Sequence, residues 1–258
     1  MAGAIIKGFI NKNCVNSSDI YFIRQNKEKQ AQQAKELGIN GCDDYDSLIE
    51  NSDILFLGVK PVVFPTLLPQ IAKSVKKKNP LVVSMAAGLT TDSIREMLGY
   101  DAKIIRIMPN VNAAIAMSTT AVCKNEFASD EDLATIKNLF STIGLTTEVP
   151  ENQFAIFTAI AGCSPAYVYM FIDGLARGAQ KMGMNKQKAL EIAASAVIGS
   201  ASMYAQSNEH PQELVDKVCS PGGTTIEGVT TLEEYKFTAG VVKAVENSIL
   251  KDRELSKK

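Results

Sequence analysis

The stretch VCSPGGTTI, residues 218–226, combines the residue types that bind a small anion. Pro221 cannot continue a helix from the segment before it, and Gly222 and Gly223 permit backbone angles that other residues avoid. Because the following residues have a helical pattern, the loop ends at a helix N-terminus, whose free N–H groups and dipole favour negative charge. The stretch also supplies three hydroxyl groups, from Ser220, Thr224 and Thr225. It therefore predicts a carboxylate site, with a capped turn between two helices as the alternative.

The longer run DKVCSPGGTTIEGVTTLEE, residues 216–234, closely resembles the signature of the pyrroline-5-carboxylate reductase family, which makes proline. The match is long and ordered, so it is far more specific than a short glycine pattern. The resemblance implies that the loop holds the substrate carboxylate, mainly through backbone N–H groups. The implied substrate-binding residues are Ser220, Gly222, Gly223, Thr224 and Thr225. It also implies a catalytic role for Thr225, whose hydroxyl would meet the ring nitrogen and help to protonate it.

Other polar residues near these motifs are weaker candidates. Glu151 is a candidate for the substrate side, and a solvated carboxylate at a helix start is the alternative. Lys217 precedes the loop and is a candidate for the cofactor side, against the commoner outcome of an exposed helix lysine. Cys163 and Cys219 lie in motif stretches, but nothing nearby in the sequence would lower a thiol pKa enough for nucleophilic work, so we interpret both as packing residues.

Composition excludes several classes of function. The 258 residues are 46% hydrophobic and 21% charged with a net charge of -1, so we expect a globular protein without a nucleic-acid surface. We see no apolar run of membrane-span length and no N-terminal signal segment. The five cysteines are scattered, which suits reduced thiols in a cytoplasmic protein. His210 is the only histidine and precedes Pro211, where it is expected to flank a helix start, so we expect neither a metal site nor a Ser-His-Asp triad.

The first half of the chain alternates short apolar runs with polar or helical segments. An Ala/Ile/Gly-rich helix pattern opens the chain, and a polar helix ends near residues 37–38. The predicted strands are 19–23, 53–59, 81–85 and 103–108, followed by 119–123, a helix that starts near Ser129 and ends near Gly144, and a last strand at 145–149. Continuous apolar runs of this length are typical of buried parallel strands. The pattern predicts an α/β, Rossmann-like doubly wound sheet.

Ligands of such sheets bind beyond the carboxyl ends of the strands, and the segments there are rich in Gly, Pro and small residues. FLGVKP, VSMAAG and RIMPN also resemble the successive cofactor-side loops of the reductase family. The cofactor-binding residues implied in these loops are Gly58, Val59, Lys60, Pro61, Met85, Ala86, Ala87, Gly88, Pro109 and Asn110. By the same resemblance, Arg24 and Asn26 meet the adenosine ribose and its 2′-phosphate. Since no acidic residue closes that strand, we expect NADPH, with NADH as the alternative.

The resemblance is incomplete at the start. The family opens with a hydrophobic strand and a G-x-G-x-M-A turn, whereas Met1-Ala2-Gly3-Ala4 aligns with the end of that turn, which implies a cofactor contact for Met1. The first strand and its first glycines, roughly ten residues, are missing from the pattern. We expect a truncated gene model or a late start codon, and the alternative is a genuine short form that folds poorly and cannot hold cofactor.

The second half shows a helical pattern without clear strands. Ser164-Pro165 resembles an N-cap with Pro at the first helical position, and Asn185 precedes a helix rich in Ala and Gly. We place the boundary at Pro150, with a nucleotide-binding domain over 1–149 and an all-α dimerisation and substrate-binding domain over 150–258. Apolar helices in so small a domain favour completion by a second subunit over a self-contained bundle. The resemblance, which extends over AIAGCSPAYVYMFIDGLARGAQKMGM, implies homodimers that assemble further into decamers.

The resemblance implies reduction of L-1-pyrroline-5-carboxylate to L-proline by NAD(P)H. A cyclic iminium is already electrophilic, so hydride transfer needs positioning more than a strong acid. One alternative is a reductase of another cyclic imine or small carbonyl acid. The other is a non-catalytic dimerising fragment that has lost cofactor binding.

Overall fold

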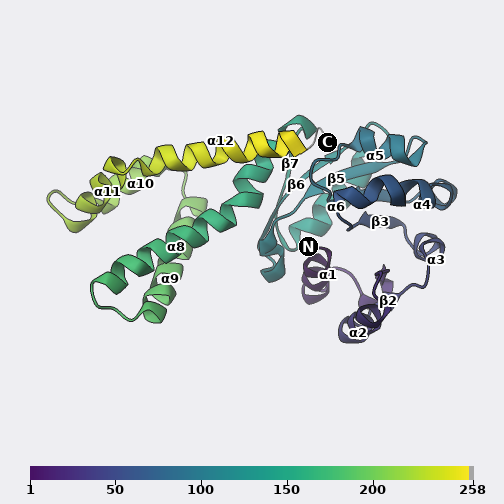
Figure 1. Ribbon diagram of the computed structural model, residues 1–258, viewed down its shortest axis with the longest axis horizontal. Helices are drawn as coiled ribbons and strands as arrows, with labels where there is room; N and C mark the ends of the chain where they lie inside the picture. Colours follow the sequence, from purple (N-terminus) through teal and green to yellow (C-terminus); the bar gives the residue numbers. More distant parts are fainter. Residues whose placement is uncertain (256–258) are drawn as a thin grey trace. The chain divides into compact units, whose positions relative to one another are not determined.

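The structure is a computed structural model, and it describes residues 1–255 (Figure 1). The chain forms two compact units: Met1–Gly162 together with the described residues from Ile249, and Cys163–Ser248. The units divide beyond the predicted boundary at Pro150. The reason is that residues just after Pro150, among them Phe154, Ala159 and Ala161, are buried in the first unit.

The first unit contains a five-stranded sheet in the order β3-β4-β5-β6-β7. Its strands are β3 (Ile54–Leu57), β4 (Leu81–Ser84), β5 (Ile104–Met108), β6 (Ser118–Lys124) and β7 (Gly144–Glu148). All neighbouring pairs are parallel except β5 and β6, which are antiparallel. Two very short strands, β1 (Tyr21–Phe22) and β2 (Asn40–Gly41), form a separate parallel pair. The predicted strands are confirmed, although 19–23 is reduced to two paired residues, and β2 had no strand signal.

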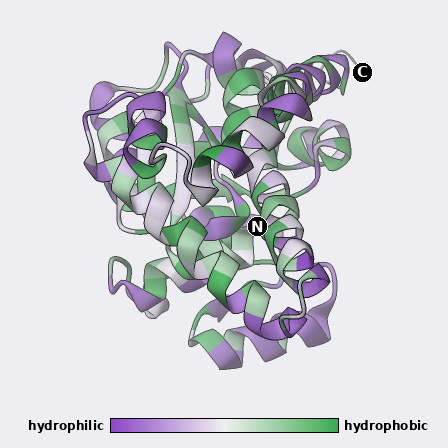
Figure 2. Ribbon diagram, turned by 90° about the vertical axis from the view of Figure 1, so that its left-hand side faces the viewer, coloured by the Kyte–Doolittle hydropathy of each residue, from purple (hydrophilic) through white to green (hydrophobic). Residues whose placement is uncertain are grey.

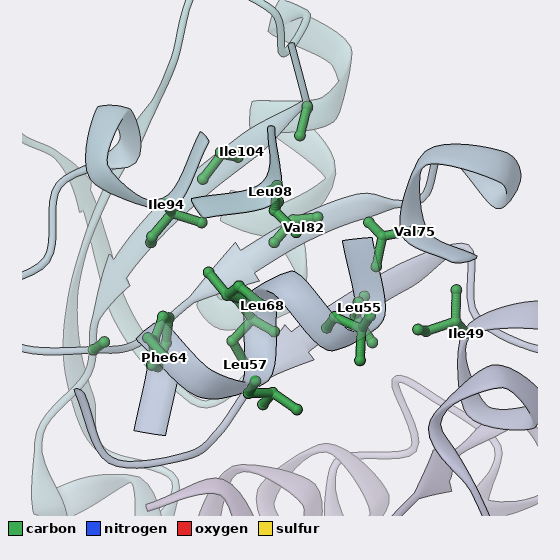
Figure 3. Packing of buried hydrophobic residues seen from close by; sticks show 14 residues of the cluster. Ile49, Leu55, Leu57, Phe64, Leu68, Val75, Val82, Ile94, Leu98 and Ile104 are labelled. Carbon is green, nitrogen blue, oxygen red and sulfur yellow. The ribbon is translucent and has the colours of Figure 1, made fainter. Parts of the chain in front are cut away.

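Helices cover both faces of the larger sheet. They are α1 (Ala2–Asn11), α2 (Lys27–Leu37), α3 (Tyr45–Glu50), α4 (Phe64–Lys78), α5 (Thr91–Leu98) and α6 (Asp130–Ser141), with 3-10 turns at Ser17–Asp19, Pro61–Val63, Val111–Ile115 and Glu151–Gln153. On one face, Leu55 and Leu57 pack with side chains of α4 and α5 (Figure 3). On the other face, Ile105 and Ile107 pack with side chains of α1 and α6. This two-residue alternation is the pleat of a buried strand, and it explains the continuous apolar runs.

Gly144 has a different role from the one its position suggested. The helix before it ends at Ser141, and Gly144 is instead the first residue of β7, with φ +144°. A Cβ atom there would collide with the backbone of Ser118, the residue that faces it in β6. Close approach of two strands, rather than helix termination, therefore requires this glycine.

The second unit is helical, as predicted. It contains α8 (Ser164–Lys181), α9 (Lys186–Gln206), α10 (Pro211–Val218), α11 (Thr224–Glu234) and most of α12 (Phe237–Leu255). The Asn185 side chain caps α9 by accepting a hydrogen bond from the Lys188 N–H, as its position suggested. The Ser164 cap is wrong, because α7 (Phe154–Phe157) and a π-helix (Thr158–Cys163) run directly into α8, so that Ser164 is already helical.

These helices expose many large hydrophobic side chains, and hydrophobic residues are green in Figure 2. Exposed examples include Tyr169, Met170, Ile198, Met203 and Tyr235. The helical run Glu151–Lys181 is long and apolar enough to cross a membrane by length and composition, so the expectation that no apolar run reaches that length is wrong. One such run is weak evidence for a membrane, and exposed apolar helices equally suit an interface between subunits.

Candidate functional site

A cavity of about 1210 Å³ lies between β1 and β3 in the first unit. In the described chain each of these strands pairs on one side only, β1 with β2 and β3 with β4, so that both have a free edge. Side chains of α1 and α4, among them Ile5, Phe9, Leu67 and Ile71, also line the cavity. It exceeds the roughly 300–1,000 Å³ of most small-molecule pockets, so it has room for more than a compact ligand.

Five of the predicted cofactor residues line this cavity: Met1, Arg24, Gly58, Val59 and Met85. Met1 precedes α1, and the other residues lie just beyond the carboxyl ends of strands. Arg24 follows β1, Gly58 and Val59 follow β3, and Met85 follows β4. Parallel strands bring their carboxyl ends to one edge of a sheet, which is where dinucleotides bind in doubly wound folds. The predicted cofactor residues that line the cavity therefore lie at one edge of the sheet, and their contact with a cofactor stays a prediction.

The remaining predicted cofactor residues do not line the cavity, and several have structural partners. Asn26 caps α2, because its side chain accepts a hydrogen bond from the Lys29 N–H at 2.8 Å. Lys60 and Pro61 begin the 3-10 turn before α4. Ala86 is buried, whereas Ala87 and Gly88 form the turn that leads into α5.

Pro109 and Asn110 are buried, and Asn110 is the centre of a local network. Its Nδ2 donates to the Ala161 carbonyl at 3.0 Å, and its Oδ1 accepts from the Asn112 and Thr119 N–H groups. These bonds hold the chain after β5 against β6 and against the π-helix. The Asn110 side chain thus shapes the loop around the sheet edge.

The start of α1 faces the cavity without a capping side chain. Met1 is the N-cap residue and makes no side-chain cap hydrogen bond, and Ala2 and Gly3 line the cavity. A Cβ atom on Gly58 would approach the Ala2 Cβ to 3.0 Å, so glycine allows the end of β3 to lie close to α1. A helix N-terminus with free N–H groups beside glycine-rich turns fits the phosphate groups of a dinucleotide.

Arg24 is fixed at two points by α2. Its backbone N–H donates to Gln30 Oε1 at 2.7 Å, and its guanidinium Nη1 donates to Gln33 Oε1 at 2.7 Å. Gln30 is buried, and its Nε2 donates to the Cys42 carbonyl at 2.8 Å. Arg24 therefore has a defined position at the cavity, with its cationic head group at the end of β1.

Glu151 is fully engaged within the first unit. Its carboxylate accepts hydrogen bonds from the Thr91 N–H at 2.8 Å and the Thr91 hydroxyl at 3.0 Å, and it pairs with Arg106 at 3.2 Å. The Arg106 side chain is only 6% exposed and stacks over the Phe154 ring at 4.5 Å. This arrangement caps α5 and neutralises a buried cation, and the substrate role predicted for Glu151 stays a prediction.

The loop between α10 and α11 has the backbone expected of it. Gly222 has φ +65°, and the Gly223 N–H donates to the Ser220 carbonyl at 3.0 Å. A Cβ atom on Gly223 would meet the Ser220 side chain and lie 3.1 Å from the Ser220 carbonyl oxygen, so a larger residue there would force Ser220 to move. Gly223 is also the N-cap of α11 and leaves the helix without a side-chain cap. Thr224 and Thr225 occupy the first turn, where free N–H groups favour an anion.

Lys217 at the end of α10 and His210 at its start both have polar partners nearby in the chain. Lys217 pairs with Glu209, and His210 caps α10 by accepting a hydrogen bond from the Gln212 N–H at Nδ1. The role of His210 at a helix start is confirmed, and Lys217 is an exposed, ion-paired helix residue. Its predicted approach to the cofactor stays a prediction.

All five cysteines are free thiols. Burial, together with the nearby Glu151 carboxylate, raises the pKa of the Cys123 thiol from 9.0 to about 12. Within residues 1–255, no group of three or more His, Cys, Asp or Glu side chains is placed to hold a metal ion.

Comparisons with known proteins give consistent results over both halves. A family model described as pyrroline-5-carboxylate reductase dimerisation matches residues 151–255, and one described as NADP oxidoreductase, coenzyme F420-dependent, matches residues 1–88. The pyrroline-5-carboxylate reductase of Escherichia coli (strain K12) is 39% identical over 257 residues, which cover 100% of this chain and 95% of the relative.

Solved structures agree. The structure of Plasmodium falciparum pyrroline carboxylate reductase, with NADP bound, has a TM-score of 0.88 at 28% identity. The match covers 98% of this chain and 93% of the Plasmodium chain. The structure of the 1-pyrroline-5-carboxylate reductase of Streptococcus pyogenes has a TM-score of 0.86 at 35% identity. The match covers 96% of this chain and 94% of the Streptococcus chain.

Among the cavity residues that sequence reasoning missed are Ala2, Gly3 and Gln33. Gly3 and Ala2 lie in the short stretch already aligned with the phosphate turn, so that signal was available. Gln33 carried no sequence signal for such a role, because a glutamine in a polar helix is usually exposed to solvent. Its three-residue spacing from Gln30 places both on one helix face, which is the only hint that the sequence offers.

Proposed function

The chain belongs to the pyrroline-5-carboxylate reductase family, and from that premise we propose that it reduces L-1-pyrroline-5-carboxylate to L-proline with NAD(P)H. The observation that carries this proposal is the 220–225 loop, where a tight glycine turn opens an uncapped helix. Such a turn suits a small carboxylate, and it lies in a chain that is similar to named reductases along its whole length.

The first unit supplies the residues that would hold the cofactor. The uncapped start of α1, with Met1, would receive the pyrophosphate, and Arg24 would receive the ribose 2′-phosphate. Gly58, Val59 and Met85 would border the remainder along the sheet edge. The absence of an acidic residue after β1 supports NADPH over NADH, because a carboxylate there would repel the extra phosphate. When bound, the dinucleotide supplies a hydride.

The second unit supplies the residues that would hold the substrate. The free backbone N–H groups of Thr224 and Thr225 at the start of α11 would bind the carboxylate, with Ser220, Gly222 and Gly223 shaping the turn. Reduction adds a hydride to the imine carbon and a proton to the imine nitrogen, so the residues must orient one face of the ring and keep the nitrogen protonated. We assign the nitrogen contact to the Thr225 hydroxyl. The iminium is already electrophilic, so orientation is the main requirement.

We also propose the domain assignment of 1–149 for the nucleotide and 150–258 for dimerisation and substrate binding. The exposed apolar helices support a homodimer, and decamers remain a proposal that sedimentation can test. Five free thiols support a cytoplasmic location. Light scattering of the purified chain should give at least twice its monomer mass of 27.8 kDa.

Turnover of L-1-pyrroline-5-carboxylate tests the function directly. Loss of NADPH fluorescence should depend on both the chain and the imine, and proline should form in equal amount. A six-membered cyclic imine acid is the matched control, and faster turnover of it would favour the reductase of another imine. NADPH binding without turnover of either imine would overturn the proposal, and a dimer that binds no nucleotide would identify the non-catalytic fragment.

A further inference from the structure

Gln33 connects three parts of the cofactor cavity. Its Oε1 accepts from the Arg24 guanidinium at 2.7 Å, and its Nε2 lies 3.7 Å from where a Cβ atom on Gly3 would stand. Arg24 follows β1, and Gly3 is in the first turn of α1. Gln33 itself lies on α2 and lines the same cavity. One neutral side chain therefore lies between the cation at the ribose end and the helix start at the pyrophosphate end.

The neutral character of Gln33 is important for the charge of Arg24. Among residues 1–255, no carboxylate lies within ion-pair distance of the Arg24 guanidinium. An amide oxygen fixes the direction of the guanidinium and leaves its full positive charge for a ligand. A carboxylate at the same place would fix it equally well but would neutralise it. Gln33 thus orients Arg24 without cancelling its charge.

A second contact, from the Arg24 backbone, further fixes the orientation of the Arg24 side chain. The Arg24 backbone is held by Gln30, one turn earlier on α2, so both ends of the residue are tied to a single helix. A guanidinium held at both ends loses little conformational freedom when it binds a phosphate, because its rotamer is already selected.

We propose that Gln33 is a positioning residue that aims the Arg24 guanidinium at the 2′-phosphate and so sets the preference for NADPH over NADH. This inference rests on the proposed function. It assigns no chemical step to Gln33, which acts only through Arg24.

The experiment uses 2′,5′-ADP and 5′-AMP as probes, with calorimetric titration of the whole chain. These nucleotides differ only by the 2′-phosphate and carry no nicotinamide, so binding is measured independently of turnover. The wild-type chain should bind 2′,5′-ADP at least about tenfold more tightly than 5′-AMP. Gln33→Glu should remove most of this preference and leave the affinity for 5′-AMP within about twofold, because only the charge of Arg24 is cancelled.

Gln32→Glu is the matched control, since it makes the same change of charge one residue away. Gln32 also lines the cavity, but its side chain donates to Glu36 at 2.7 Å, whereas the hydrogen bond from the Arg24 guanidinium goes to Gln33. Its effect on the preference should therefore stay below about twofold, because an exposed charge acts weakly at a distance. An equal loss in both variants would show that general charge, not the contact to Arg24, sets the preference, and would overturn the proposal.

A double-mutant cycle separates the two residues. In an Arg24→Ala background the preference should already be lost, and Gln33→Glu should add less than about twofold. An unchanged preference in Gln33→Glu, or a wild-type chain without preference, would overturn the inference even if the imine is turned over. Conversely, if Gln33→Glu removes the preference for 2′,5′-ADP but the wild-type chain reduces no imine, the role of Gln33 is supported and the proposed reaction is contradicted.

Discussion

At the residue scale, the Thr225 hydroxyl is the group assigned to the imine nitrogen. Thr225→Ala should lower kcat/KM for the imine by about 100-fold, since a positioned proton donor typically contributes that much. NADPH affinity should stay within about twofold, because the substitution is in the substrate loop. Steady-state kinetics with an independent NADPH titration checks both quantities.

Thr231→Ala is the control on the same helix. Its hydroxyl donates to the Glu227 carbonyl at 2.8 Å, a bond internal to α11. It should change kcat/KM by less than about twofold, since exposed substitutions away from a site have small effects. Equal losses in the two variants would remove Thr225 from the mechanism.

The ion pair of Glu151 and Arg106 gives a second prediction at this scale. Glu151→Gln should lower the free energy of unfolding by about 2 kcal/mol, below the 3–5 kcal/mol of fully buried pairs because Glu151 is partly exposed. The urea midpoint measures this, with Glu148→Gln as the control, since its pair with Lys137 is exposed. Unchanged stability with a raised KM for the imine would instead support the substrate role.

The buried Cys123 thiol predicts a pH dependence. Its folded pKa, about 12, lies above the ordinary 9.0, so the folded state favours the protonated thiol. Its contribution to stability is therefore full below pH 9 and is lost as pH rises toward 12. In the native state at pH 9, iodoacetamide should alkylate Cys123 far more slowly than in urea, as peptide mass spectrometry would show. Equal rates in both states would contradict this burial.

At the element scale, the turn before α11 depends on one glycine. Gly223→Ala should raise KM for the imine about tenfold, because the new Cβ atom displaces Ser220 and moves the N–H groups that face the carboxylate. Gly228→Ala is the control, since a Cβ atom there meets nothing within 4 Å and lies inside the same helix. It should leave KM unchanged and stabilise the protein by about 0.5–1 kcal/mol. A lower KM in Gly223→Ala would show that the turn does not hold the substrate.

Much of the fold could be predicted from local signals. Continuous apolar runs predicted β3, β4 and β5, and capping residues predicted the start of α9 and of α10. Two features failed for lack of a local signal. Asn40–Gly41 form a strand only because Ile20 and Phe22 supply carbonyl acceptors from a distant segment. Ser164 resembles a cap, yet the preceding residues pack into the first unit and continue the helix without a break.

The candidate site was predictable to a similar degree. The sequence predicted the turn at residues 220–225 and the loops beside the cavity, since both depend on glycine, proline and their immediate neighbours, and the binding roles of these residues stay predictions. It did not identify Gln33, because that role depends on tertiary contact with Arg24, nine residues away. Nor did it show that the Asn26 side chain caps α2, and the cofactor contact of Asn26 stays a prediction. Loop motifs are visible in one sequence, whereas the partners of a side chain are not.

At the scale of the whole molecule, the division of the sheet is the main feature. In the described chain β1 and β3 do not pair with each other, and the cavity between their free edges is lined on both sides by apolar residues of helices. Backbone N–H and C=O groups at both edges therefore have no partner strand. Because the cavity lining is apolar on both sides, it suits a strand whose two faces are both apolar. The geometry is that of a parallel sheet with room for one more strand.

This geometry leads to a prediction about an extended chain. A version with an apolar strand of about five residues and a Gly-x-Gly turn joined to Met1 should fill the cavity and pair with both edges. Its Tm should rise by at least about 5 °C, and its NADPH affinity by at least about tenfold, because the new turn adds N–H donors beside α1. An extension of equal length rich in Ser and Pro should change neither quantity, since Pro cannot donate to a ladder. If the 258-residue chain already binds NADPH as tightly as the extended one, the added strand is dispensable and the α1 N-terminus with Arg24 suffices to hold the cofactor.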